Sequence, residues 1–110
     1  MQISVRRMDR ATIIDISGDI DFSNSPQVRK ALLDEVTDNR NRRVILNLSA
    51  VGYMDSSGVA SLVESLKASR DIGLRFILTG VSGPAREVLQ LSRLLKVFEI
   101  YDTEVQALAV

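Results

Sequence analysis

Two serines and an aspartate lie together in the middle of the chain, in the sequence Asp55-Ser56-Ser57-Gly58. They follow an apolar run typical of a buried strand, residues 44–48, and precede a helical pattern of apolar residues that starts at Val59. A helix that begins here presents free backbone N–H groups and a partial positive charge. Ser56 can therefore be a plain helix N-cap, or a hydroxyl that accepts a phosphate and later loses it.

Two neighbours of Ser56 favour a functional hydroxyl over a plain cap. A helix needs one cap, yet Ser57 supplies a second hydroxyl. Gly58 in the first turn lowers helix propensity by up to about 1 kcal/mol. We interpret this loss as room for the backbone of a partner that comes close. The two interpretations of Ser56 are compatible, because a capping serine can also be modified.

Asp19 and Asp21 form a second candidate site, in the loop that leaves the strand predicted at residues 12–17. If the strands are parallel, this loop and the loop of Asp55 share one edge of the sheet, the edge where open α/β sheets bind ligands. Clustered carboxylates can bind Mg²⁺ or the basic groups of a partner. The simpler alternative is two solvated loop aspartates.

Two other motifs are weaker candidates. Gly80-Val81-Ser82-Gly83 lies between a strand and a helix, but it matches neither glycine-rich phosphate-binding pattern, so we interpret it as a turn. Arg40, Arg42 and Arg43 form a basic run that we expect to be solvated, and we expect the same of the pair at residues 6–7.

Composition excludes several classes of function. The chain has 110 residues, which suits a single domain over residues 1–110, with 14 basic and 14 acidic side chains. A net charge of zero argues against nucleic-acid binding, which needs a basic surplus. Cysteine and histidine are absent, which excludes disulfides, the usual zinc sites and Ser-His-Asp catalysis. No apolar run approaches the roughly 18 residues of a membrane span, and no signal-like segment opens the sequence, so we expect a cytoplasmic protein.

The positions of apolar residues predict an α/β fold in the order β-β-α-β-α-β-α-β-α, with a mixed, mostly parallel sheet of four to five strands. A hairpin comes first, and residues 44–48 read as a central strand covered on both faces. We expect Leu91 to face inward from the third helix, and Val105 and Leu108 from the last. The predicted strands are residues 3–5, 12–17, 44–48, 74–79 and 97–100, and the predicted helices are residues 26–38, 56–72, 84–91 and 103–109.

These motifs, taken in order along the chain, match a known family. The chain resembles STAS domains, and within them the bacterial anti-sigma factor antagonists. The resemblance covers nearly the whole chain without a large insertion. The matching segments are Gly18-Asp19-Ile20-Asp21, Val44-Ile45-Leu46-Asn47-Leu48, Tyr53-Met54-Asp55-Ser56-Ser57-Gly58, and residues 94–100 followed by Ala107-Leu108.

The resemblance implies a partner switch. In that family the unmodified antagonist binds an anti-sigma factor that is also a serine kinase of the GHKL type, and a sigma factor is released. The kinase phosphorylates the serine that corresponds to Ser56, and a PP2C-type phosphatase removes the phosphate. Asp21 corresponds to an acidic position of the family's partner-binding surface, and Asp55 to the acidic residue before the acceptor. The expected partner-binding residues are Asp19, Asp21, Asp55, Ser56, Ser57 and Gly58.

The chain departs from many antagonists directly after this motif. Where those proteins carry Leu-Gly, this chain has Val59-Ala60-Ser61. The departure concerns the partner rather than the fold, and it leaves open a second function, that of a regulatory STAS subunit of a bacterial ABC transporter for lipids.

An enzymatic or nucleotide-binding role for Asp19, Asp21 and Asp55 is a third alternative. It lacks support because the chain has no histidine, no phosphate-binding loop and no pairing of a nucleophile with a base. Any nucleotide binding would therefore be weak. We expect a binding module without catalytic residues, cofactor or metal ion.

Overall fold

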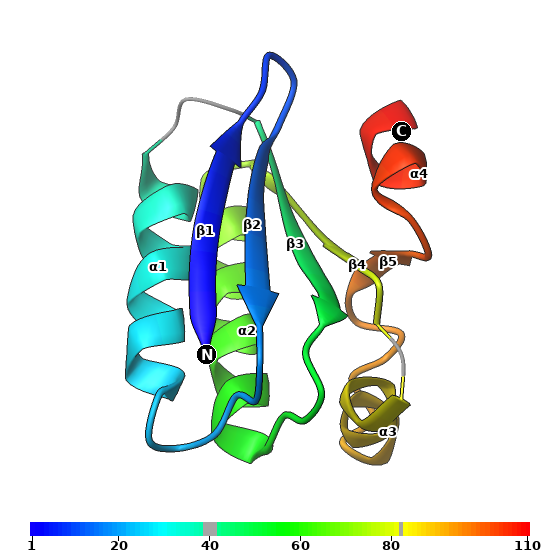
Figure 1. Ribbon diagram of the computed structural model, residues 1–110. Helices are drawn as coiled ribbons and strands as arrows, with labels where there is room; N and C mark the ends of the chain where they lie inside the picture. The colour runs from blue at the N-terminus through cyan, green and yellow to red at the C-terminus, as the bar shows by residue number, and fades with distance from the viewer. Residues whose placement is uncertain (39–41, 82) are drawn as a thin grey trace.

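The computed structural model describes residues 1–38, 42–81 and 83–110, so Arg40 and Ser82, named above, lie outside the described residues. Strands and helices follow one another in the order predicted from the sequence (Figure 1). The strands are β1 (Gln2–Arg7), β2 (Thr12–Ser17), β3 (Arg43–Ala50), β4 (Arg75–Thr79) and β5 (Glu99–Tyr101). The helices are α1 (Ser25–Thr37), α2 (Ser56–Asp71), α3 (Gly83–Leu91) and α4 (Glu104–Ala109).

The five strands form one sheet in the order β1-β2-β3-β4-β5. The first two strands form the predicted antiparallel hairpin, and every later neighbour pair is parallel. Because β2, β3 and β4 are parallel neighbours, their carboxyl ends open onto the same edge of the sheet. The loops that carry the candidate residues leave the sheet at that edge.

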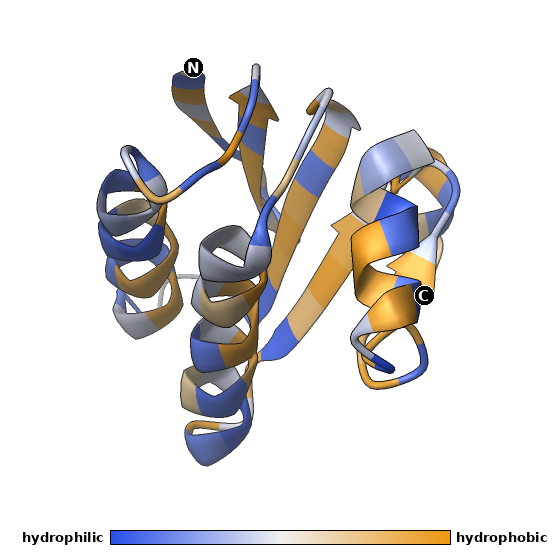
Figure 2. Ribbon diagram, turned by 90° about the horizontal axis from the view of Figure 1, so that it is seen from below, coloured by the Kyte–Doolittle hydropathy of each residue, from blue (hydrophilic) through white to orange (hydrophobic). Residues whose placement is uncertain are grey.

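The larger core lies between the sheet and the helices α1, α2 and α3. Alternate residues of β3, Val44, Leu46 and Leu48, point to this side and are at most 1% exposed. Helix α1 contributes Val28 and Leu32, both fully buried. Figure 2 shows the hydrophobic strands behind α1 and α2, whose hydrophilic sides face outward.

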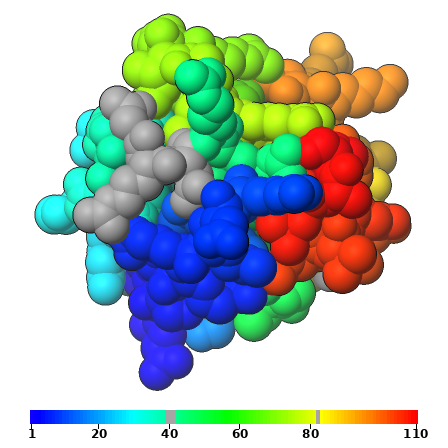
Figure 3. Space-filling model, turned by 90° about the horizontal axis from the view of Figure 1, so that it is seen from above, coloured from blue at the N-terminus to red at the C-terminus, as the bar shows by residue number. Residues whose placement is uncertain are grey.

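A smaller core lies on the opposite face of the sheet. Ile13, Ile45 and Ile77 occupy one level across β2, β3 and β4, and Ala107 of α4 packs against them. The central strand β3 is therefore covered on both faces, as its apolar run predicts. Figure 3 shows α4 packed beside the N-terminal hairpin.

Three arginine side chains, Arg6, Arg7 and Arg43, connect the sheet to α4 and α1. This corrects the expectation that they are simply solvated. Arg43 donates to the carbonyl oxygens of Ala107 and Leu108 at 3.2 and 2.9 Å. Arg6 pairs with Asp15 and with Glu104 of α4, both at 2.6 Å, and Arg7 pairs with Glu35 of α1.

Several predicted details of the C-terminal third are wrong. The last strand is Glu99–Tyr101 rather than residues 97–100, because Val97 lies in a turn that bonds back to Leu94. Leu91 and Val105 are each 76% exposed, whereas both were expected to face inward. The core position of α4 is taken by Ala107, with Leu108 partly buried beside it.

None of the helices in the described ranges combines the length and apolar character that a membrane crossing requires.

Candidate functional site

The loops after β2 and β3 lie side by side, as the parallel strands predict. Ile20 and Met54 form a parallel bridge between the two loops. The Ile20 N–H donates to the Tyr53 carbonyl at 2.9 Å, and the Asp55 N–H donates to the Ile20 carbonyl at 3.1 Å. This bridge brings the loop of Asp19 and Asp21 next to the start of α2.

Asp55, rather than Ser56, is the N-cap of α2. Its backbone is extended, and its Oδ1 accepts hydrogen bonds from the N–H groups of Ser57 at 2.9 Å and Gly58 at 3.2 Å. Its Oδ2 accepts a third backbone bond, at 3.1 Å, from the N–H of Phe22 in the neighbouring loop. One carboxylate thus caps the helix and holds the loop after β2 against it.

The hydrogen bonds that Asp55 receives favour its charged form. The hydroxyl of Ser57, followed by the backbone N–H groups of Gly58, Ser57 and Phe22, lowers the pKa of Asp55 below its usual value. The site therefore carries a fixed negative charge at neutral pH, directly beside Ser56.

The two serines have different surroundings. Ser57 donates its hydroxyl to Asp55 Oδ1 at 2.5 Å and is only partly exposed. Ser56 occupies the first helical position and is exposed, and its hydroxyl forms no hydrogen bond with any residue that the structure describes. The hydroxyl of Ser56 is thus available to a reagent from outside, whereas that of Ser57 is held by the cap.

Gly58 is buried in the packing of the chain itself. A Cβ atom at this position would lie 2.6 Å from Met54 Cγ and 2.9 Å from Ile20 Cγ2. Within the chain, the groups that approach this glycine closely are these two side chains. Gly58 lets α2 begin directly on top of the bridge between the loops.

Asp21 turns toward its own loop, whereas the carboxylate of Asp19 lies toward the loop after β3, with Oδ1 3.3 Å from the position that a Cβ atom would take at Gly52. Asp21 Oδ1 accepts bonds from the backbone N–H of Ser23 at 2.9 Å and from the Ser23 hydroxyl. Asp19 is exposed, and the Asn24 amide donates to its carbonyl at 2.9 Å. Among the described residues these carboxylates form no group that could hold a metal ion. The geometry fits an acidic surface better than a Mg²⁺ site.

Exposed apolar residues lie in the two paired loops, and they were not among the residues expected to bind a partner. Phe22 is 80% exposed and Tyr53 is 49% exposed, one in each of the paired loops. A cavity of about 350 Å³ starts at Ser56 and is lined by Val59, Val63 and Leu94, among others. An aromatic residue between Asp21 and Ser23 was the available signal, since aromatic residues are enriched in protein interfaces.

The chain is similar in sequence to a known family and to proteins of known name. The sequence model of the STAS domain family matches residues 2–107. The anti-sigma F factor antagonist of Paenibacillus polymyxa is 29% identical over 108 residues, which cover 98% of this chain and 92% of that protein. The anti-sigma-B factor antagonist of Listeria monocytogenes is 31% identical over 108 residues, covering 94% and 93%.

A solved structure is also similar to this chain. An anti-sigma-factor antagonist (STAS) domain protein from Planctomyces limnophilus superposes with a TM-score of 0.85 at 25% identity, over 97% of this chain and 94% of that one. Because the family model matches nearly the whole of this chain, the chain belongs to the STAS domain family.

Proposed function

We propose that this protein is an anti-sigma factor antagonist whose binding is switched off by phosphorylation of Ser56. The observation that carries the proposal is the free, exposed hydroxyl of Ser56 beside the Asp55 carboxylate, while the Ser57 hydroxyl is bound to that carboxylate. The similar proteins from Paenibacillus polymyxa and Listeria monocytogenes, both named anti-sigma factor antagonists, support the same role.

The proposed partner surface consists of the two loops and the first turn of α2. Asp19, Asp21 and Asp55 make it acidic, and Phe22 with the cavity next to Ser56 gives it an apolar part. Exposed aromatic residues beside charged groups are typical of protein interfaces. Ser56 and Ser57 lie at its centre, and Gly58 acts indirectly by fixing where α2 begins. We expect the partner to be an anti-sigma factor with GHKL-type serine kinase activity and a complementary basic patch.

Phosphorylation changes the charge of this surface more than its shape. A phosphate adds about −1.5 to −2 charge at neutral pH. The N–H groups of Ser57 and Gly58 are already bonded to Asp55, so a phosphate on Ser56 would add its charge next to an existing carboxylate. Like charges brought together at an interface cost several kcal/mol, and about 2.7 kcal/mol is already a hundredfold in affinity. Release of the partner therefore does not require refolding.

Mass mapping tests the acceptor. The protein, its Ser56→Ala variant and its Ser57→Ala variant are incubated with the candidate kinase and ATP, and the modified peptide is sequenced by mass spectrometry. We expect one phosphate on Ser56, none on the Ser56→Ala protein, and subsequent removal by a metal-dependent PP2C phosphatase. Phosphate on Ser57, or on neither serine, would refute the assignment.

Binding measurements test the switch. Ser56→Asp should weaken binding to the partner, and Ser56→Ala should bind persistently in the presence of ATP. Val105→Asp is the control, because it makes a neutral-to-acidic change at an exposed position of α4, which packs on the opposite face of the sheet. If Ser56→Asp and Ser56→Ala bind the partner equally well, charge repulsion at this site is not the switch.

Capture from a native lysate identifies the partner class. The unmodified protein should retain a GHKL-type kinase. Retention of the ATPase or permease of an ABC transporter instead would identify a transport subunit and contradict the antagonist role.

A further inference from the structure

The turn that leads from β2 into α1 is held by hydrogen bonds at every residue. Each backbone N–H group from Ile20 to Ser25 donates one. In chain order, the acceptors are the Tyr53 carbonyl, Asn24 Oδ1, Asp55 Oδ2, Asp21 Oδ1 and, for the last two N–H groups, the Asp21 carbonyl. The Asn24 amide also donates to the Asp19 carbonyl at 2.9 Å. With all its donors satisfied, the backbone of this turn is fixed in one conformation.

Phe22 lies within this fixed turn, yet its side chain is left in solvent. It is 80% exposed, the largest exposed fraction among the large apolar residues of the described ranges. An exposed ring contributes little to folding, because little of its surface is removed from water. Its burial against a partner would cost little conformational entropy, because the backbone that carries it is already ordered. Phe22 therefore has the properties of a preorganised binding residue.

One carboxylate connects Phe22 to the proposed phosphorylation site. Asp55 Oδ2 accepts the Phe22 N–H at 3.1 Å, while Oδ1 accepts the N–H groups of Ser57 and Gly58 in the first turn of α2. Ser56, the residue after Asp55, is exposed as well. An enzyme whose active site closes around the Ser56 hydroxyl therefore also comes near Phe22.

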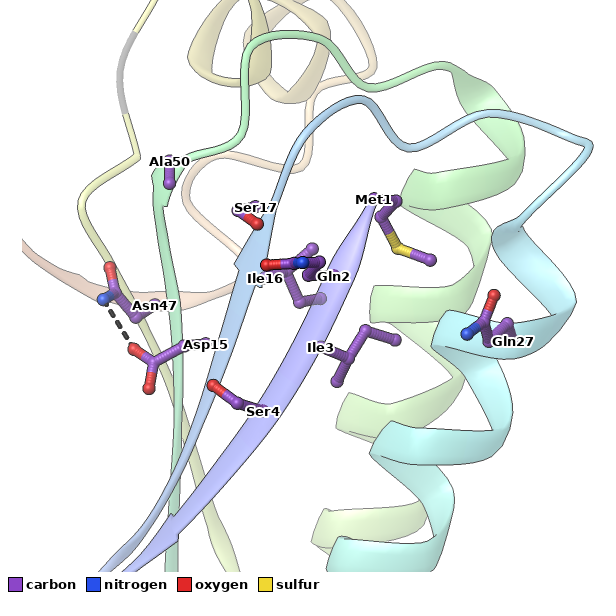
Figure 4. Close-up of a pocket in the computed structure, with 10 residues that line it drawn as sticks. All are labelled: Met1, Gln2, Ile3, Ser4, Asp15, Ile16, Ser17, Gln27, Asn47 and Ala50. Atoms are coloured by element: carbon purple, nitrogen blue, oxygen red, sulfur yellow. Dashed lines mark hydrogen bonds between the residues drawn. The ribbon is translucent and has the colours of Figure 1, made fainter.

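The cavity at the start of β1 lacks a residue of this kind. It measures about 510 Å³, and Figure 4 shows Ile3 on the α1 side of β1, with Asp15 and Asn47 on the other side. The Asn47 amide donates to the Asp15 carboxylate at 2.8 Å, and Asp15 also pairs with Arg6. Ile3 is half-buried. Groups that are paired within the chain offer a partner less than the exposed ring of Phe22 does.

We propose that Phe22 is the residue by which the serine kinase recognises this protein, through an apolar pocket beside the active site of the kinase. Asp55 is then the positioning residue that holds Phe22 for this contact. The inference rests on the proposed function and adds its main determinant of recognition. An aromatic side chain that fills a pocket is the kind of contact that dominates the affinity of an interface. The carboxylates of Asp21 and Asp55 beside it call for basic groups at the rim of that pocket.

Phosphorylation kinetics with the candidate kinase and ATP test the role of Phe22. Phe22→Ala should raise the KM for this protein by about ten- to thirtyfold with little change in kcat, as expected when a binding contact is removed. Phe22→Trp, which keeps an aromatic ring, should retain most of the affinity. Val105→Ala is the control, since it truncates an exposed apolar side chain on α4 and should leave KM unchanged. Both alanine variants should keep the urea midpoint of the original protein, because both positions are exposed.

Asp55→Asn tests the positioning role, because it separates the two functions of the carboxylate. The asparagine oxygen can still cap α2, but its amide then faces the Phe22 N–H, so that two donors meet and the bond to the turn is lost. We expect the Phe22 amide to exchange faster with solvent in NMR spectra, and KM to rise about three- to tenfold. In the Phe22→Ala background the same change should raise KM much less, because Asp55 acts through Phe22.

The outcomes separate this inference from the proposed function. A KM for Phe22→Ala equal to that of the original protein, with Ser56 still phosphorylated, would overturn the recognition role alone. Equal effects of Asp55→Asn with and without Phe22 would overturn the positioning role. An original protein that receives no phosphate on Ser56 would refute the proposed function and this inference with it. A molecular mass that rises with concentration for the original protein but not for Phe22→Ala would also overturn the inference, since Phe22 would then bind a second copy.

Discussion

Replacing Asp55 by alanine should destabilise the protein, whereas replacing Ser56 should not. Asp55→Ala removes the cap of α2, worth about 1 kcal/mol, and the bond from the Phe22 N–H, worth about 1 kcal/mol more. We therefore expect a loss of about 2 kcal/mol in the free energy of unfolding. Ser56→Ala removes an exposed hydroxyl that bonds to no described residue, so it should change the free energy of unfolding by less than about 0.5 kcal/mol.

Urea unfolding followed by circular dichroism at neutral pH measures both variants, with Asp55→Asn as the matched control. Asparagine is also a good N-cap, so Asp55→Asn should retain at least about half of the stabilisation. The reasoning is refuted if Ser56→Ala costs more than Asp55→Ala, since the hydroxyl of Ser56 would then be a structural group. An Asp55→Ala protein as stable as the original would show that neither the cap nor the loop bond contributes.

Three further predictions concern glycines and pH. Gly58→Ala should lower the unfolding free energy by about 1 to 3 kcal/mol, because its Cβ would overlap Met54 and Ile20; a neutral result in urea unfolding would contradict this packing. Gly80→Ala should lower the unfolding free energy more than Gly73→Ala does in the same assay. Both glycines have positive φ, but only at Gly80 would the new Cβ meet backbone, 2.8 Å from the Ser49 nitrogen. Equal losses of unfolding free energy would exclude that clash. Acid should destabilise the protein, because the Ser57 hydroxyl lowers the pKa of Asp55, and Arg6 and Arg75 lower those of Asp15 and Glu99. Their folded-state pKa values lie below the unfolded ones, so this stabilisation is complete above about pH 5 and is lost progressively as the pH falls further. A urea midpoint that rises on acidification below about pH 4 would contradict the assignment.

Most of the fold follows from strong local patterns in the sequence. The apolar run at residues 44–48 has no polar face to expose, so it had to be a central strand. The errors fall where elements are short. Helix α4 has six residues, less than two turns, and Val105, Ala107 and Leu108 allow more than one choice of buried face. The choice is made by Arg43 and the isoleucines of the sheet, which lie far away in sequence.

The sequence predicted that the loops of Asp21 and Asp55 share one edge of the sheet, but the contacts within the candidate site depend on residues that are far apart in the chain. Aspartate and serine are about equally good N-caps, so the sequence alone could not decide between Asp55 and Ser56. The decision comes from the backbone, which is extended at Asp55 and helical at Ser56. The reason for Gly58 lies in Met54 and in Ile20, which only the bridge between the loops brings together. No local sequence pattern predicts that bridge.

The division of roles between Asp55 and Ser56 bears on how a switch at this position would work. An acidic group in the first turn of a helix interacts favourably with the helix dipole, by about 0.3 to 1 kcal/mol at an exposed position. At Ser56 the same group lies beside the Asp55 carboxylate, on the surface proposed to meet the partner. A negative charge there would leave the fold intact while it opposes binding. Because Asp55 holds both the helix and the loop, we expect a modification of Ser56 to affect the proposed complex and not the stability of the domain.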